Sequence, residues 1–168
     1  MRRAIRVLAA GDRDSGLVVD TVILGFEQRK APGGSVVGIK GTLIEIALAE
    51  LVRLRTDDLL VLEDGGLVEV VAEAEALIEA RAADLSALAR LAWQLGDRHV
   101  PVEILPNRIR VRREPALEAL LEHLGAKIAI IEAPFEPEGG AYAAHTHGER
   151  HHGHDHGHHS HDHHHKHD

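Results

Sequence analysis

Short apolar stretches separated by turn residues fill the first 75 positions of the chain, a pattern typical of β-strands. The stretches are rich in valine, isoleucine and leucine, and glycine or proline interrupts them at residues 11–16, 32–34 and 65–66. We therefore expect a small all-β unit, with strands within RAIRVLAA, GLVVDTVILGF, SVVGIK, DDLLVLEDGG and LVEVVAEA.

Two places in this half carry more specific signals. Residues 64–66, Asp-Gly-Gly, stand between LLVLE and LVEVV, and glycine tolerates the positive φ that a tight turn requires. These two stretches should therefore pair as a hairpin. Residues 42–54 suit either a helix or a buried strand, and Ala47, Leu48 and Ala49 favour a helical piece there.

The periodicity changes near residue 75. A predicted strand covers residues 77–82, and Asp84 is then placed to cap the N-terminus of a helix that Gly96 ends. The apolar face of this helix is expected to consist of Leu85, Leu88, Ala92 and Leu95.

Two further strands, VPVEIL and RIRVRRE, are joined by Pro106 and Asn107. Pro115 then opens a second helix, and Gly125 ends it before the last strand, KIAIIEAPF. The leucines of this helix recur at positions i, i+3, i+4 and i+7, namely Leu117, Leu120, Leu121 and Leu124.

The second half therefore predicts strand–helix–strand–strand–helix–strand over residues 77–135, the order of a ferredoxin-like split βαβ domain. The expected fold class is mixed β and α/β (α+β). We expect a β-rich N-terminal domain over 1–75, a ferredoxin-like metal-binding domain over 76–142, and a disordered histidine-rich tail over 143–168. One face of the second sheet would need cover from the first domain or from a second subunit.

The tail carries the strongest chemical signal. Of its last 24 residues, 13 are histidine, and neutral imidazole is a common ligand for Ni(II), Cu(II), Zn(II) and Co(II) but suits Mg, Ca or Cu(I) poorly. The candidate metal ligands here are His145, His147, His151, His152, His154, His156, His158, His159, His161, His163, His164, His165 and His167.

Glycine and serine punctuate the tail, and no aliphatic residue follows Ala144, so the tail should be disordered without metal and should exchange ions quickly. A purification tag and a solvated tail without function are simpler explanations. Tags are usually uninterrupted, however, and neither explanation accounts for the choice of histidine.

Composition narrows the function classes. Only 2% of residues are aromatic, so the core should consist of aliphatic side chains with Trp93 as its one very large member. The net charge of −8 argues against a nucleic acid or an anionic membrane as partner. Cysteine is absent, which excludes disulfides, thiolate zinc sites and cysteine nucleophiles.

The sequence lacks the signals of membrane-spanning proteins, secreted proteins and several classes of enzyme. No run approaches the roughly 20 apolar residues of a membrane span, and residues 5–10 are too short a stretch for a secretory signal, so we expect a cytoplasmic protein. The motifs HExxH, GxSxG, the P-loop and a helix-opening GxGxxG are missing as well. We therefore expect a protein that is not an enzyme.

Three stretches together resemble one known family. They are LGDRH at residues 95–99 leading into PVEI, APFEPEGGAY at 133–142, and the histidine-rich end, and they are similar to the urease accessory protein UreE family. RTDDLLVLEDGGLVEVVA also resembles the end of that family's N-terminal β domain. Where some members carry histidines after the central hairpin, this chain has arginines at 108, 110, 112 and 113, and the basic pattern of the N-terminal domain is reduced to residues 28–30.

The resemblance implies a nickel metallochaperone with Ni(II) as cargo, although Zn(II) and Cu(II) suit the same ligands. It implies a homodimer in which the histidine matching His99 binds nickel together with its copy at the subunit interface. It also implies delivery to the urease apoenzyme through a complex with a GTPase and other accessory proteins.

For each single histidine, a structural role has to be compared with metal binding. A loop histidine such as His99 is more often a hydrogen-bonding residue than a ligand, but a two-fold axis supplies a second copy. His123 lies off the leucine face of its helix and should be structural and exposed to solvent. His145 and His147 point the same way in an extended chain, so they either close over a metal at His99 or begin the storage tract.

We therefore expect a homodimeric nickel carrier that stores ions on its tail and presents one at paired His99 side chains. One alternative is a general buffer for zinc, copper or nickel, because imidazole ligands alone bind Cu(II) more tightly than Ni(II). The other is a peptide-binding scaffold whose β domain acts while the tail is incidental.

Overall fold

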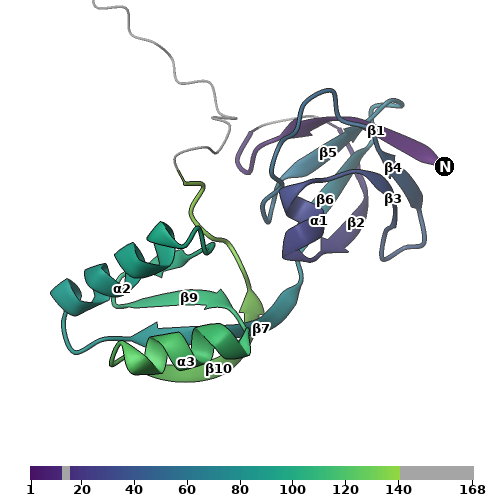
Figure 1. Cartoon of the computed structure of the whole chain (residues 1–168). Helices are drawn as coiled ribbons and strands as arrows, with labels where there is room; N and C mark the ends of the chain where they lie inside the picture. Colours follow the sequence, from purple (N-terminus) through teal and green to yellow (C-terminus); the bar gives the residue numbers. More distant parts are fainter. Residues whose placement is uncertain (13–15, 141–168) are drawn as a thin grey trace, which may run out of the picture.

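The computed structural model describes residues 1–12 and 16–140 (Figure 1). This part of the chain is α+β, with two sheets and three helices. In chain order the elements are β1 (Arg2–Leu8), β2 (Val18–Leu24), α1 (Phe26–Lys30), β3 (Gly34–Val37), β4 (Leu43–Ile46), β5 (Leu59–Leu62), β6 (Leu67–Ala72), β7 (Ala74–Arg81), α2 (Leu85–Asp97), β8 (Glu103–Leu105), β9 (Arg108–Arg112), α3 (Pro115–His123) and β10 (Lys127–Pro134).

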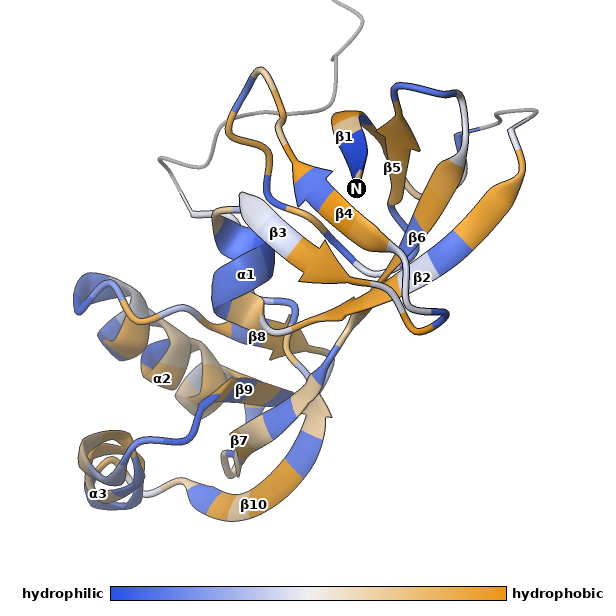
Figure 2. Ribbon diagram, turned by 90° about the vertical axis from the view of Figure 1, so that its right-hand side faces the viewer, coloured by the Kyte–Doolittle hydropathy of each residue, from blue (hydrophilic) through white to orange (hydrophobic). Residues whose placement is uncertain are grey.

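The first six strands form one mixed sheet in the order β2-β6-β5-β1-β4-β3. β1 pairs in parallel with β4, and β2 with β6, while the other pairs are antiparallel. Inward side chains alternate along these strands and make one aliphatic core, including Ala4, Val22, Ile44, Leu60 and Val68. The apolar colouring of β2, β4, β5 and β6 in Figure 2 follows this packing.

The predicted hairpin at residues 64–66 is confirmed. Gly65 has φ +83°, and its amide donates to the Leu62 carbonyl at 2.9 Å as β5 turns into β6. The helical piece expected within 42–54 is wrong, because Ile44 and Ile46 alternate with less buried residues and pair with β1 as the strand β4.

The second sheet has the order β10-β7-β9-β8 and is antiparallel throughout. Its elements follow the predicted strand–helix–strand–strand–helix–strand order. Both α2 and α3 cover the same face, and their leucines pack on Ile78, Ala80, Ile109 and Val111. The division of the whole chain at residues 75 and 142 into separate domains stays a prediction.

Local signals set the ends of these helices. The Asp84 carboxylate accepts the Ala87 amide at 2.7 Å and caps α2, Pro115 opens α3, and Gly125 has φ +81° just beyond α3. His123 is exposed, as expected.

Trp93 does not belong to the core. It lies two residues from both Leu91 and Leu95, about 200° around the helix from each, since each residue turns the helix by about 100°. Leu91 and Leu95 are buried, so the indole points outward and is 73% exposed. The expected apolar face also loses Leu85, which is 68% exposed at the start of α2.

Part of the uncovered face of the second sheet is filled by α1. Phe26 from this helix packs on Leu77 of β7 and meets Phe135 edge to face, with ring centroids 5.2 Å apart. The cover expected from the first half of the chain is therefore supplied by a five-residue helix that the sequence pattern did not predict.

Arg29, three residues after Phe26 on α1, joins the two sheets. Its side chain is 0% exposed and donates to the Leu24 and Leu54 carbonyls at 3.1 and 3.4 Å. Both carbonyls belong to the part of the chain that forms the six-stranded sheet and α1, residues 1–72, here called the first unit. Arg29 also donates to the Phe135 carbonyl and the Glu136 carboxylate, both at 2.7 Å, just beyond the last strand of the second sheet. A buried guanidinium with all these partners fixes one sheet relative to the other.

A buried carboxylate organises the end of the first sheet. Asp20 on β2 accepts the amides of Thr21, Lys40 and Thr42 at 2.8, 2.9 and 3.1 Å, and a Cβ on Gly38 would overlap its carboxylate. Burial raises the pKa of Asp20, but the hydrogen bonds from Thr42, Lys40 and Thr21 outweigh burial and hold the pKa well below its ordinary value.

Replacing Asp20 by asparagine should lower the free energy of unfolding at pH 7, because one carboxylate oxygen becomes an NH₂ group facing backbone donors. A depressed pKa stabilises the fold above the pKa of the unfolded state, and this contribution is lost as the pH falls through the folded-state value. The deficit of Asp20→Asn relative to the natural protein should therefore shrink below about pH 4. Urea unfolding from pH 7 to pH 2 measures it, and a deficit independent of pH would contradict the account.

Candidate metal site

His99 follows the end of α2, where the backbone closes a Schellman turn. The His99 amide donates to the Gly96 carbonyl at 2.9 Å, and the Val100 amide donates to the Leu95 carbonyl at 3.0 Å. His99 thereby adopts the left-handed conformation, φ 57°, at a position that glycine usually occupies. Such a backbone costs a residue with a Cβ about 1–2 kcal/mol, and packing of Leu95 and Val100 in the core maintains it.

The surroundings of His99 favour a cation. The residue is exposed, and it stands at the carbonyl end of α2, which carries a partial negative charge. Asp97 adds a carboxylate to this end, while the last turn of the helix contains no basic residue. The neighbouring Arg98 donates back to the carbonyl and side chain of Gln94 at 2.8 and 2.7 Å.

The helix that leads to His99 presents an apolar outer face. Leu85, Ala89 and Trp93 recur at intervals of four residues and are all exposed. Single exposed apolar residues are ordinary, but a row with an exposed tryptophan is typical of a surface that another protein covers.

The chain leading toward the histidine-rich segment passes close to this site. The Glu138 amide donates to the carbonyl of Val102 at 2.8 Å, and Val102 lies three residues after His99. In Figure 1 this yellow-green stretch runs past the C-terminal end of α2. The last described residues of the chain therefore lie beside the loop that follows His99.

Of the predicted ligands, only His99 can be placed. The 13 histidines from His145 to His167 lie outside the described residues, as does the disorder expected for them. Within residues 1–12 and 16–140, no three histidine, aspartate or glutamate side chains gather in a metal-binding arrangement.

Sequence reasoning did not single out Arg29, Arg53 or Glu136. These three residues contact one another between the two sheets, and Arg29 and Glu136 are 107 residues apart in the chain. Arg29 lies in the basic residues 28–30 and Glu136 lies in the stretch 133–142, and both stretches resemble family motifs. Neither motif indicates that Arg29 and Glu136 are in contact.

The arginines of β9 lie where some family members carry histidines, and they form ion pairs. Arg108 and Arg110 both approach the Glu79 carboxylate on β7 at 3.0 Å, as does Arg81. Burial acts to raise the pKa of Glu79, but the guanidinium groups outweigh burial and hold the pKa below its ordinary value. This strand is therefore a surface of paired charges.

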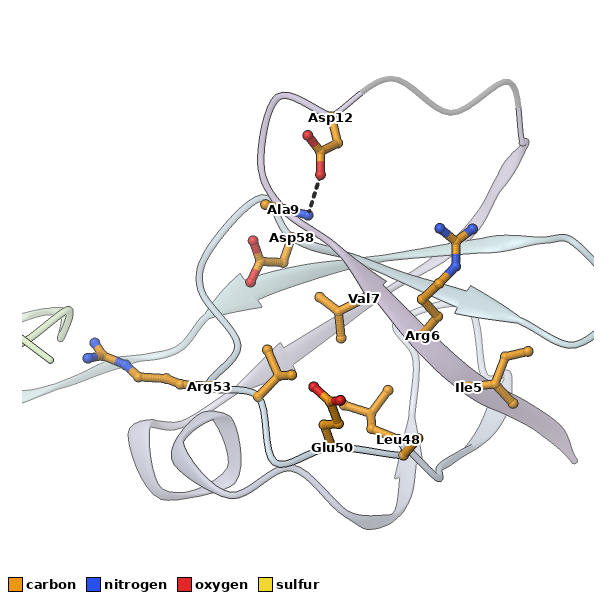
Figure 3. A pocket seen from close by; sticks show the side chains of 11 residues that line it. Ile5, Arg6, Val7, Ala9, Asp12, Leu48, Glu50, Arg53 and Asp58 are labelled. Carbon is orange, nitrogen blue, oxygen red and sulfur yellow. Dashed lines mark hydrogen bonds between the residues drawn. The ribbon is translucent and has the colours of Figure 1, made fainter. Parts of the chain in front are cut away.

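A hollow of about 560 Å³ lies beside β1 in the first unit (Figure 3). Val7 and Leu48 line it together with the acidic groups Asp12 and Glu50, and Arg53 stands at one end with its guanidinium extended away. A peptide-binding β domain would use this hollow, yet its mixture of charges favours no particular peptide.

No helix in the described ranges combines the length and apolar character that a membrane span requires.

The fold and site define an α+β protein that presents an exposed histidine at a helix terminus, and Glu138, seven positions before the histidine-rich segment in the sequence, is bonded to the loop that follows this histidine. Residues 75–168 match the family described as UreE urease accessory protein, C-terminal domain. The chain belongs to this family.

Whole-chain relatives agree with this assignment. The chain is 49% identical to the urease accessory protein UreE of Bradyrhizobium sp. strain BTAi1 over 90% of its own length and 73% of the relative. It is 42% identical to the protein of the same name from Chelativorans sp. strain BNC1, over 90% of this chain and 94% of the relative.

The backbone at His99 gives a test of whether its side chain serves the fold. In metal-free protein, His99→Gly should raise the free energy of unfolding by up to about 1 kcal/mol, because relief of the left-handed strain exceeds the entropy cost of glycine. His99→Ala keeps the strain and should change stability little. Urea denaturation compares the two variants, and equal destabilisation by both would show that the imidazole itself supports the fold.

Proposed function

We propose that this protein is a homodimeric carrier that binds Ni(II) through a pair of His99 side chains and delivers it during assembly of the urease active site. The observation that carries the proposal is an exposed imidazole, held by a strained but rigid turn at the negative end of a helix. Membership of the urease accessory family supports the destination of the metal.

One imidazole does not make a metal site, and symmetry supplies the second. Two-fold contacts bring equivalent residues together, so a dimer formed through the apolar face of α2 would place two His99 side chains across one interface. The exposed Trp93 is the type of large side chain that such interfaces bury.

The histidine-rich segment supplies further ligands. His99 lies within about 11 Å of Val102 by chain length, and the seven steps along the chain from Glu138 to His145 span up to about 25 Å. His145 and His147 can therefore reach a metal at His99, and the later histidines can store additional ions.

Function consists of transfer and not of turnover. Imidazole contacts can be replaced one at a time by those of an acceptor, which avoids a high barrier to release. The proposed acceptors are the urease apoenzyme and its accessory complex with a GTPase. Selectivity for Ni(II) over Zn(II) or Cu(II) has to come from the paired site and the acceptor, since the tail ligands favour Cu(II).

Calorimetric titration with Ni(II) tests the paired site. A protein truncated after Ala144 loses the tail histidines but keeps every core residue of the described structure. It should bind half an equivalent of nickel per chain at its tightest site, because two symmetry-related imidazoles share one ion. His99→Ala should remove this site and leave the dimer and its circular dichroism unchanged.

The exposed His123 gives a matched control, and His123→Ala should leave the titration unaltered. A full equivalent of nickel per chain, or a tight site that survives in His99→Ala, would contradict a shared site.

A further inference from the structure

We propose that residues 135–138, here called the tail root, are clamped between the two sheets by Arg29 and Arg53, and that this clamp positions the histidine-rich segment for metal exchange with His99. The inference rests on the proposed function and adds positioning residues to it. Arg29 and Arg53 belong to the first unit of the structure, whereas His99 follows α2 in the second half of the chain.

Arg53 holds the tail root together with Arg29. It donates to the Pro137 carbonyl at 2.6 Å and to the Glu136 carboxylate at 3.4 Å. The Thr56 amide donates to the same carboxylate at 3.2 Å. Three consecutive residues of the tail root, from Phe135 to Pro137, are thus bound by polar groups of the first unit.

Burial makes these contacts firm. Phe135 and Pro137 are buried, Arg29 is fully buried, and the side chain of Arg53 is 21% exposed. Burial lowers the pKa of the Arg53 guanidinium, although the nearby Glu136 acts to raise it. Charged groups in such surroundings exchange partners less readily than surface pairs.

The second sheet holds the tail root from the opposite side. The Glu138 amide donates to the Val102 carbonyl at 2.8 Å, one residue before β8 begins at Glu103. The tail root therefore has partners in both halves of the structure, and its last hydrogen bond is to Val102, in the loop between His99 and β8.

The clamp sets the length of free chain between the fold and the first tail histidine. With the tail root bound, His145 lies seven positions after the last held residue, Glu138; with the root released, it lies eleven positions after Pro134, the end of β10. Because effective concentration falls roughly as the −3/2 power of linker length, release should lower it about twofold, with a further loss because the direction of exit is no longer fixed.

Trp93 reports metal at His99. It is the only tryptophan and precedes His99 by six residues, about 9 Å along a helix, so a paramagnetic Ni(II) ion at His99 should quench its fluorescence. The full chain is titrated in nickel buffered by a competing chelator. Free Ni(II) is then fixed whatever the other tail histidines bind.

Arg53→Met should raise the free Ni(II) concentration at half quenching by at least about twofold. Loss of a positive charge by itself would act in the opposite direction, and Arg55→Met is the matched control because Arg55 is exposed and two residues away. Arg55→Met should not raise the midpoint. The same rise is expected in Glu136→Ala, which removes the carboxylate shared by Arg29 and Arg53.

A double-mutant comparison separates positioning from a general structural effect. Replacing His145 and His147 together by alanine should raise the midpoint in the natural protein and raise it less in the Arg53→Met background. Equal effects in both backgrounds would show that the clamp does not act through the tail, and would overturn the inference.

Amide hydrogen exchange of the metal-free full chain tests the clamp itself. The Glu138 amide should be protected in the natural protein and in Arg55→Met, and should exchange faster in Arg53→Met and Glu136→Ala. Unchanged protection in both of the latter variants would overturn the inference while leaving the His99 site untouched. Quenching that persists in His99→Ala would instead contradict the proposed function.

Discussion

The buried guanidinium of Arg29 is the interaction on which the arrangement of the molecule depends. It ties Leu24 and Leu54 of the first unit to Phe135 and Glu136 beyond the last strand of the second. Removing one partner of a buried ion pair typically costs about 3–5 kcal/mol, because the remaining charge loses its compensation. Without Arg29 the two halves of the structure would be joined by the Phe26 contacts and by the bonds of Arg53 and Thr56 to residues 136–137. The chain beyond β10 would then be held less firmly relative to α2.

The proposed metal site combines one rigidly held ligand, His99, with tail histidines that are expected to exchange. A Schellman turn holds His99 in a conformation that costs backbone energy, and the core contacts of Leu95 and Val100 supply the compensation. The histidine-rich sequence of the tail is expected to offer many exchangeable imidazoles. A carrier needs both properties, because a fixed ligand binds the ion at a defined position and exchangeable ligands allow its transfer to an acceptor.

Features with local causes could be predicted from the sequence, and features with distant causes could not. The Asp84 cap, the Pro115 helix start and the turn at Gly65 follow from the chemistry of a few adjacent residues. Within residues 42–54 the local pattern suits a helix or a buried strand and favours the helix, because β1, the parallel partner of β4, lies about 40 residues earlier and leaves no local signal. The five residues of α1 are too few to show a helical period, and the contact of Arg29 with Phe135 spans 106 residues. The family resemblance of residues 95–99 indicated His99 as a candidate ligand, but nothing in the local pattern revealed its strained backbone.

The central claim is that one nickel ion is shared by two His99 side chains at a two-fold interface. Anomalous diffraction at the nickel edge, from crystals of the nickel-loaded full chain, measures this directly. The account predicts a nickel peak between two symmetry-related His99 imidazoles, at the roughly 2 Å distances typical of metal–nitrogen bonds, with the apolar face of α2 buried beside it. Nickel bound only away from His99, or one separate ion at each His99 with α2 exposed, would contradict it.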